Sequence, residues 1–222
     1  MADASHELRS PLTAIRTGLE VGLSHPDHAP WPQIAGRAVR QCQRLEQLIA
    51  GLLVLARADA HQLAARRQPV DLAALLADLA ATPAPGIGIE LSVPPGTATA
   101  GNPEDLSRMF RNLLDNAVRY ARHRVLITAA ARPEGIVVEI ADDGPGIGEE
   151  ERERVFGRFV RLDASREQAS GSAGLGLAIA REIATAHGAT IVLTEAPGGG
   201  TRAVVTVRST AGAAAETTIR SA

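Results

Sequence analysis

A histidine and a carboxylate stand side by side near the start of the chain, within Ser5-His6-Glu7-Leu8-Arg9-Ser10-Pro11-Leu12. From this motif onward Leu8, Leu12, Ile15 and Leu19 recur at helical spacing, and at ~100° per residue His6 lies roughly 150° from the centre of their stripe. The imidazole is therefore expected to face solvent, and Ser10 shares that face. Glu7 could hold one ring nitrogen protonated and leave the other free as a nucleophile. Taken alone, such a pair is more often a solvated helix surface.

A second polar group falls on the run Asn112-Leu113-Leu114-Asp115-Asn116-Ala117-Val118-Arg119-Tyr120. Helical spacing places Asn112, Asn116 and Arg119 together, opposite an apolar stripe made of Leu106, Phe110, Leu113 and Ala117. Two carboxamides four residues apart can offer oxygens to a hydrated Mg²⁺, and an arginine beside them can meet phosphate charge. An exposed polar helix face is the commoner origin of such a pattern.

Three further motifs contain glycine. Asp142-Asp143-Gly144-Pro145-Gly146 follows a predicted strand, so the backbone can approach a ligand closely while an aspartate accepts a hydrogen bond, although an ordinary turn gives the same pattern. Val155 to Asp163 contains two of the three phenylalanines, which suggests a lid that docks through aromatic anchors, or else a small core contact. Gly171 to Ala180 opens a predicted helix, where free amides and the helix dipole favour phosphate.

Together, in this order, the five motifs resemble those of sensor histidine kinases of two-component systems, over residues 5 to about 208. The resemblance implies that His6 receives a phosphoryl group with help from Glu7, and that Ser10 assists a phosphatase activity toward the regulator. Mg²⁺ would be held by Asn116 and Asn112, and Asp142 would accept from the adenine amino group. The ATP-binding residues that it implies are Asn112, Asn116, Arg119, Tyr120, Asp142, Gly144, Gly146, Arg161, Gly174, Leu175, Gly176 and Leu177. Ser172 and Ala173 depart from the family pattern, which predicts weaker or altered nucleotide binding.

Two amphipathic helices are predicted to position His6, over residues 2–23 with a kink at Pro11 and over about 32–58, joined by a loop at 24–30. A lone hairpin cannot bury both apolar stripes, so we expect a homodimer that forms a four-helix bundle. Cys42 is expected in a helix interface.

Beyond a break at 62–69, helices are predicted at 71–81, 103–121 and 174–187, and strands at 87–93, 124–131, 135–141, 190–195 and 202–208. They fit an α+β sandwich with a mixed, largely antiparallel sheet, of the Bergerat or GHKL ATP-binding type that the resemblance implies. So long a loop without predicted structure, from Asp143 to Ala173, is either functional or a misreading of the pattern. We expect a dimerisation and phosphoacceptor hairpin at 1–62, an ATP-binding domain at 63–209 and a disordered tail at 210–222.

Composition excludes several classes of function. The chain has no lysine, which rules out a Walker A loop and the protein-kinase strand lysine. Its net charge of −2 without a basic block argues against nucleic acid, and its single cysteine excludes disulfides within the chain. It has no signal peptide and no run that could span a bilayer, so the chain as given is expected to be cytoplasmic. The resemblance implies that a missing N-terminal sensor region anchors the full-length protein in a bacterial inner or plasma membrane, and that a response-regulator receiver domain is its partner.

Two other functions compete with a histidine kinase. One is an ATP-hydrolysing relative of gyrase or MutL, which needs a carboxylate to activate water where this chain has Asn112, and an amide is no base at neutral pH. The other is a non-catalytic module that only dimerises and binds the regulator. A steady ATPase rate that survives His6→Gln supports the first, and ATP binding without any phosphorylated product supports the second.

Overall fold

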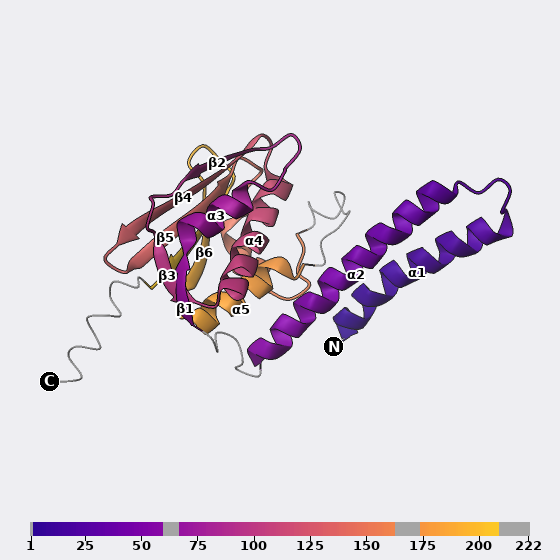
Figure 1. Ribbon diagram of the computed structural model, residues 1–222, viewed down its shortest axis with the longest axis horizontal. Coiled ribbons are helices and arrows are strands. Elements are labelled where there is room, and N and C mark those ends of the chain that lie inside the picture. Colours follow the sequence, from indigo (N-terminus) through magenta and orange to yellow (C-terminus); the bar gives the residue numbers. More distant parts are fainter. Residues whose placement is uncertain (1, 60–66, 163–173, 209–222) are drawn as a thin grey trace.

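We describe the fold from a computed structural model, which describes residues 2–59, 67–162 and 174–208. Two long helices come first, α1 (Ala2–Ser24) and α2 (Trp31–Asp59), and they form an antiparallel hairpin that projects from the rest of the molecule (Figure 1). Both helices agree with the predicted ranges within one residue. The predicted boundary at 62–69 lies mostly outside the described residues, and the predicted tail at 210–222 lies wholly outside them.

The hairpin closes around small residues and one aromatic ring. A Cβ added to Gly22 of α1 would lie 2.9 Å from the Trp31 ring, so glycine lets the two helices approach closely. The indole nitrogen of Trp31 donates to the carbonyl of Pro26 at 3.3 Å and fixes the connecting turn. The helix α1 continues through Pro11, which is buried, so the predicted kink does not interrupt it.

Within one chain the hairpin leaves much apolar surface in water. Its exposed large apolar side chains are Leu12, Leu19, Val21, Leu23, Val39, Ile49 and Leu53. Two of the four predicted α1 stripe residues, Leu12 and Leu19, are thus uncovered, as the lone-hairpin argument requires. Cys42, expected in a helix interface, is also exposed among the described residues of one chain.

A five-stranded sheet forms the rest of the core. Its spatial order is β2-β4-β5-β7-β6, with β2 and β4 parallel and the other neighbours antiparallel. The strands are β2 (Gly88–Ser92), β4 (Arg124–Arg132), β5 (Gly135–Asp142), β6 (Thr190–Glu195) and β7 (Thr201–Val207). Burial alternates along β5 and β7, so one face of the sheet is covered and the other meets solvent. The predicted mixed, largely antiparallel sheet is confirmed.

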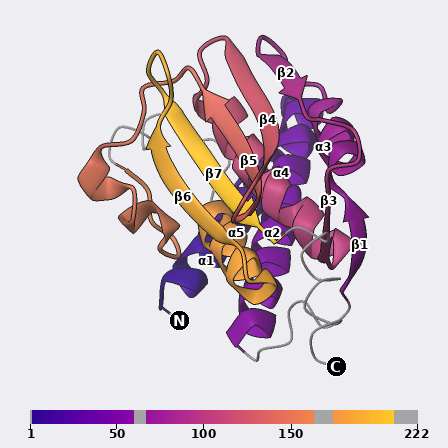
Figure 2. The same cartoon turned by 90° about the vertical axis from the view of Figure 1, so that its left-hand side faces the viewer.

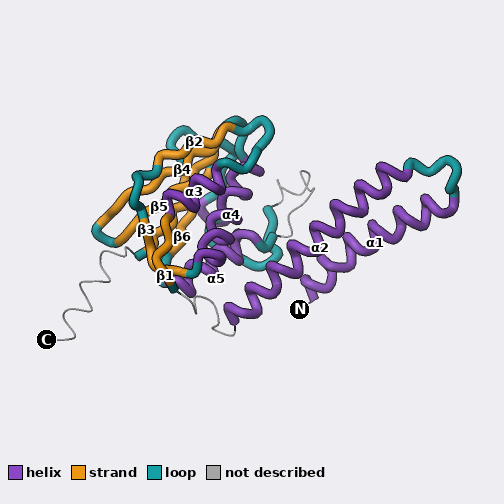
Figure 3. Tube along the Cα trace, in the orientation of Figure 1, coloured by secondary structure: helices purple, strands orange, loops and turns teal. Residues whose placement is uncertain are grey.

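Three helices cover that inner face, α3 (Leu72–Ala80), α4 (Pro103–Tyr120) and α5 (Gly176–His187) (Figure 2). They form a layer between the strands and the hairpin (Figure 3). The apolar stripe predicted on α4 is buried in full: Leu106, Phe110, Leu113 and Ala117. None of the described helices has the length and hydrophobicity needed to span a bilayer.

Two short strands and two short helices were not predicted. The strands β1 (Gln68–Asp71) and β3 (Ala98–Gly101) pair with each other as a separate antiparallel sheet. Within the predicted loop after Asp143, two 3-10 helices form, η1 (Glu149–Glu151) and η2 (Arg154–Phe156). That region is therefore partly regular, and it is not wholly structureless as predicted.

The end of the hairpin packs directly on α5. A Cβ added to Gly51 of α2 would lie 2.9 Å from the Ile179 side chain and 3.5 Å from Leu175. Around this contact Leu48, Val54 and Leu55 of α2 join the buried core. The Arg108 guanidinium of α4 also donates to the Ala50 carbonyl at 3.1 Å. The helical hairpin and the sheet domain therefore share one apolar core.

Candidate functional site

The centre of the candidate site is the carboxylate of Asp142, at the end of β5. Only 5% of this residue is exposed. Its Oδ1 accepts hydrogen bonds from the backbone N–H of Gly144 at 2.9 Å and of Thr201 at 3.2 Å. Within the described part of the chain its Oδ2 accepts none, so one oxygen is left for a ligand. Burial raises the pKa of this carboxyl group, and the two backbone hydrogen bonds act in the opposite direction.

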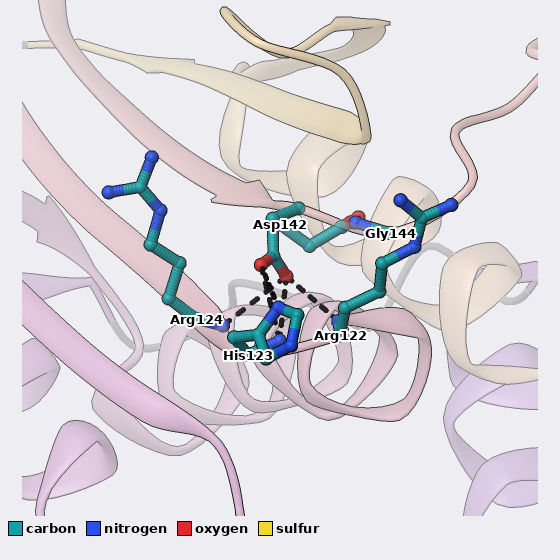
Figure 4. A network of polar contacts seen from close by, with 6 residues as sticks. Arg122, His123, Arg124, Asp142 and Gly144 are labelled. Atoms are coloured by element: carbon teal, nitrogen blue, oxygen red, sulfur yellow. Dashed lines mark hydrogen bonds and ion pairs between the residues drawn. The ribbon is translucent and has the colours of Figure 1, made fainter.

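The neighbouring Asp143 has a different task (Figure 4). Its Oδ1 accepts from the backbone N–H groups of Arg122 at 2.8 Å, His123 at 3.0 Å and Arg124 at 3.2 Å. These bonds, His123 first, hold its pKa well below the usual range. The carboxylate thus fastens the end of β5 to the segment that joins α4 and β4. Of the two aspartates in the motif, only Asp142 retains an oxygen for binding.

Glycines are required around Asp142 because backbone from distant segments comes very close. A Cβ on Gly144 would lie 2.3 Å from the Tyr120 carbonyl oxygen, and one on Gly200 would lie 2.0 Å from the Asp142 carbonyl oxygen. Gly200 also has φ +95°, a conformation that other residues rarely adopt. Gly146, with φ +78°, lies against Gly200 as well. The predicted Tyr120, Asp142, Gly144 and Gly146 thus lie together and form one edge of the candidate site.

Sequence reasoning missed Gly200 and Thr201, which complete that edge. They follow the turn between β6 and β7, and Thr201 supplies one of the two N–H groups that hold Asp142. The available signal was the run Gly198-Gly199-Gly200-Thr201, in which all three glycines have positive φ.

The predicted polar face of α4 lies beside the start of α5. Asn112 and Asn116 are both half-buried, whereas Arg119 is exposed. The Asn112 amide nitrogen donates to the Arg108 carbonyl at 2.9 Å, which turns its Oδ1 toward Gly176; a Cβ there would lie 3.3 Å from that oxygen. The asparagine motif and the last glycine motif therefore meet at one place.

The same face offers the donors that a magnesium ion would need. Among the described residues no cluster of three or more histidine, cysteine, aspartate or glutamate side chains could hold a metal by itself. Neutral amide oxygens of Asn112 and Asn116, completed by phosphate oxygens and water, suit Mg²⁺, which commonly binds through few protein ligands. The residues present therefore fit this ion only in the company of a phosphate ligand.

The start of α5 has the features of an anion-binding site. Its N-cap position, Leu175, has a buried apolar side chain that makes no capping hydrogen bond. The first amides of a helix have no intrahelical acceptor, and together with the helix dipole they attract phosphate. Gly174 (φ +68°) and Gly176 flank Leu175, and Leu177 is half-buried beside them. Gly171, Ser172 and Ala173, which belong to the same motif, lie outside the described residues.

The phenylalanine motif is attached to this turn. Val155 and Phe156 are buried, and the half-buried Phe159 has φ +64° and donates its backbone N–H to the Gly174 carbonyl at 2.9 Å. Gly174 is needed here, because a Cβ would lie 2.7 Å from the Val160 carbonyl oxygen. Arg161 is half-buried at the end of this stretch. The motif therefore packs on its own domain, which agrees with both a docked lid and a small core contact.

His6, Glu7 and Ser10 lie on the hairpin, apart from these residues. His6 and Ser10 are exposed, as the helical spacing predicted. Glu7 differs from expectation, because its Oε2 lies 3.4 Å from the Arg44 guanidinium of α2 and no described hydrogen bond joins it to His6. Among the described residues, no hydrogen bond links the His6 ring to the Asp142 pocket.

Comparison with known proteins gives two matches along the chain. Residues 101–211 match the family described as "Histidine kinase-, DNA gyrase B-, and HSP90-like ATPase". Residues 1–61 match the "His Kinase A (phospho-acceptor) domain".

The chain is also similar to individual sensor proteins. It is 33% identical over 207 residues to the signal transduction histidine-protein kinase BaeS of Escherichia coli, and the aligned region covers 90% of this chain and 44% of the relative. It is 38% identical over 203 residues to the sensor protein RstB of the same organism, and the aligned region covers 89% of this chain and 46% of the relative. The chain therefore spans about half the length of these relatives.

Among solved structures, the Acinetobacter baumannii histidine kinase AdeS is similar with a TM-score of 0.74 at 22% identity, over 91% of this chain and 97% of that one. This likeness supports the fold. Full-length ShkA in complex with AMPPNP is similar with a TM-score of 0.65 at 26% identity, over 92% of this chain and 44% of that one.

Proposed function

Because the chain belongs to the sensor histidine kinases of two-component systems, as the catalytic core that carries their phosphoacceptor and ATPase domains, we propose that it transfers the γ-phosphoryl group of ATP to His6. The observation that carries this proposal is the buried Asp142, whose Oδ1 is occupied by two backbone donors while Oδ2 is left to accept from an adenine amino group. Tyr120, half-buried at the same edge, would lie against the base.

Phosphates would extend from this pocket toward the start of α5. Positive charge and backbone N–H groups gather there: Arg119 on α4, Arg161 after the phenylalanine motif, and the amides of Gly174 to Leu177. Asn112 and Asn116 would hold Mg²⁺ against the phosphates, and this ion would supply charge neutralisation when bound. The chain's own contribution is to orient the triphosphate and to stabilise charge that moves onto its oxygens.

In the transfer itself, a ring nitrogen of His6 attacks the γ-phosphorus in line with the bond to the β–γ bridging oxygen. The new N–P bond forms as that P–O bond breaks, ADP leaves with the electron pair, and the ring keeps or releases its other proton. Glu7 is paired with Arg44 at 3.4 Å. It must leave Arg44 and turn to the imidazole before it can accept this proton or orient the ring. His6 is exposed and thus accessible to the nucleotide of its own chain or of a second copy.

The exposed apolar side chains of the hairpin support a homodimer. Leu12 is 59% exposed and Ile49 is 50% exposed, and burial of such side chains in a second hairpin stabilises a four-helix bundle by roughly 1.5–3 kcal/mol for each one fully covered. A receiver domain would then dock beside His6 and accept the phosphoryl group on an aspartate. This partner is supported by the family alone.

Ser10 is exposed one turn after His6, where its hydroxyl could position water for dephosphorylation of the regulator. If Ser10→Ala leaves the decay of the regulator phosphate unchanged, this second activity has no support.

The decisive experiment incubates the protein and its His6→Gln variant with γ-labelled ATP and Mg²⁺. Label that is acid-labile, alkali-stable and absent from His6→Gln establishes autophosphorylation. Steady release of phosphate by the variant would favour an ATPase, and ATP binding without any labelled product would favour a non-catalytic binding module.

A further inference from the structure

An arginine outside all the predicted motifs joins α5 to the phenylalanine motif. The Arg181 guanidinium binds both carboxylate oxygens of Glu153, with Nη–Oε distances of 2.5 Å and 2.8 Å. Its central carbon also lies 3.7 Å from the centre of the Phe156 ring. A two-point hydrogen bond and a cation–π contact on the same planar group fix both its position and its orientation.

These contacts hold one end of a segment whose other end is held at the start of α5. Glu153 directly precedes η2, and Phe156 ends it. Three residues later, the Phe159 N–H binds the Gly174 carbonyl at 2.9 Å. A third connection, between Arg158 and Glu182 at 3.6 Å, lies between these two points. The segment 153–162, which carries Arg161, is thus fastened along α5.

We propose that Arg181 is a positioning residue for nucleotide binding, which keeps the segment 153–162 on α5 so that Arg161 stays within reach of the phosphates. This inference rests on the proposed function. Arg181 need not touch the nucleotide, because its guanidinium is already engaged by Glu153 and Phe156.

The base and the phosphates would then depend on separate anchors. Asp142 is held by the N–H groups of Gly144 and Thr201, and neither residue contacts Arg181 through any described hydrogen bond. Loss of the Arg181 contacts should therefore weaken the phosphate side of the site and leave the base side intact. This split separates a positioning role from a general structural one.

The test measures binding of ATP and of adenosine by Arg181→Ala, by calorimetry for ATP and by NMR titration for adenosine. Apparent affinity falls in proportion to the fraction of molecules whose segment is in place. We expect the Kd for ATP to rise roughly tenfold and the Kd for adenosine to stay within about twofold, given the usual strength of such contacts. Arg181→Lys keeps the positive charge without the planar guanidinium, so its Kd for ATP should lie between those of the wild type and of Arg181→Ala.

A matched control is Arg154→Ala, which also removes one arginine side chain, here from the segment 153–162 itself. Arg154 pairs at 3.1 Å with Glu151, which lies just before the segment, and this ion pair does not join the segment to α5. Its affinity for ATP should stay near the wild-type value. Combining Arg181→Ala with Glu153→Ala should weaken ATP binding no further than the stronger single variant, because both remove the same contact.

Equal losses of ATP and adenosine binding, or an unchanged affinity for ATP in Arg181→Ala, would overturn the inference. Should Arg181→Ala unfold, Glu153→Gln keeps the shape of the side chain and the Phe156 contact and gives the same comparison. These measurements need no phosphoryl transfer. Absence of label on His6 would therefore reject the proposed kinase activity while the binding results still decided the role of Arg181.

Discussion

Replacement of Asp142 by asparagine should remove nucleotide binding without harming the fold. In the native site, Oδ1 accepts from the N–H groups of Gly144 and Thr201 at 2.9 Å and 3.2 Å. Both partners are donors, so the single oxygen of an asparagine must occupy that position. The amide nitrogen is then forced to the place of Oδ2, where it presents a donor to the donor of the adenine.

The expected loss follows from this exchange. A hydrogen bond to a charged group contributes roughly 1.5–3 kcal/mol, and the opposed donors lose hydration without gaining a partner. At about 1.4 kcal/mol for each factor of ten, the Kd for ATP should rise at least roughly a hundredfold. Because the change concerns the base, adenosine, ADP and ATP should all be affected by a similar factor.

The thermal stability of the Asp142→Asn variant should stay the same or rise, although its affinity for ATP falls. Burial raises the pKa of Asp142 above its ordinary value of 3.8, so the native state holds this proton more tightly than the unfolded state does. The contribution of such a group to stability declines as pH rises from 3.8 through the native pKa, and at neutral pH its ionised form opposes folding. Asparagine does not ionise, and Asp142→Asn should therefore unfold at the same temperature as the wild type or higher.

Calorimetric titration and thermal unfolding at pH 7 test both expectations, with Asp143→Asn as the neighbouring control. That variant makes the same chemical change on a residue whose oxygens bind backbone N–H groups, so it should lower stability and alter ATP affinity less. A loss below threefold in Asp142→Asn, or a loss confined to ATP, would show that Asp142 does not contact the base. A large drop in unfolding temperature would refute the electrostatic argument.

Three more perturbations have expected outcomes. Gly200→Ala places a Cβ 2.0 Å from the Asp142 carbonyl oxygen at φ +95°, so thermal unfolding should show a Tm lower by several degrees, and ATP binding should weaken with it. Because the pKa of Asp143 is lower in the native state, its carboxylate stabilises the fold above pH 3.8, the pKa in the unfolded state, and this stabilisation is lost as the pH falls below that value. In Asp143→Asn the free energy of unfolding, measured by denaturant titration, should therefore depend less on pH in the acid range. Gly51→Leu, where even a Cβ would lie 2.9 Å from the Ile179 side chain, should separate α2 from α5 and increase the radius of gyration measured by small-angle scattering, while the far-ultraviolet spectrum keeps its helix content.

Most of the fold could be predicted because its elements have clear periodicity. The long helices and the five main strands carry uninterrupted patterns of apolar residues. The strands β1 and β3 were missed because each has only four residues, one contains Pro69, and their pairing joins segments about thirty residues apart. No local pattern signals such a pair.

The site was predictable where its motifs are local. Asp142 was identified from the glycines that follow it, and Asn112 from its place on a helix face. The partners that hold these residues come from far along the chain: Thr201 is 59 residues from Asp142, and Arg181 is 28 residues from Glu153. Contacts over such separations depend on the folded topology, which also explains why Glu7 was assigned to His6 although it pairs with Arg44.

The glycine at position 51 has a consequence for signalling. It lets Leu175 and Ile179 seat on α2, and Leu175 belongs to the turn whose amides would hold phosphate. If the chain binds ATP as proposed, a movement of α2 against α5 and the binding of nucleotide would both act on this contact. By thermodynamic reciprocity, if a shift of α2 changes the affinity for ATP by some factor, ATP changes the equilibrium of that shift by the same factor.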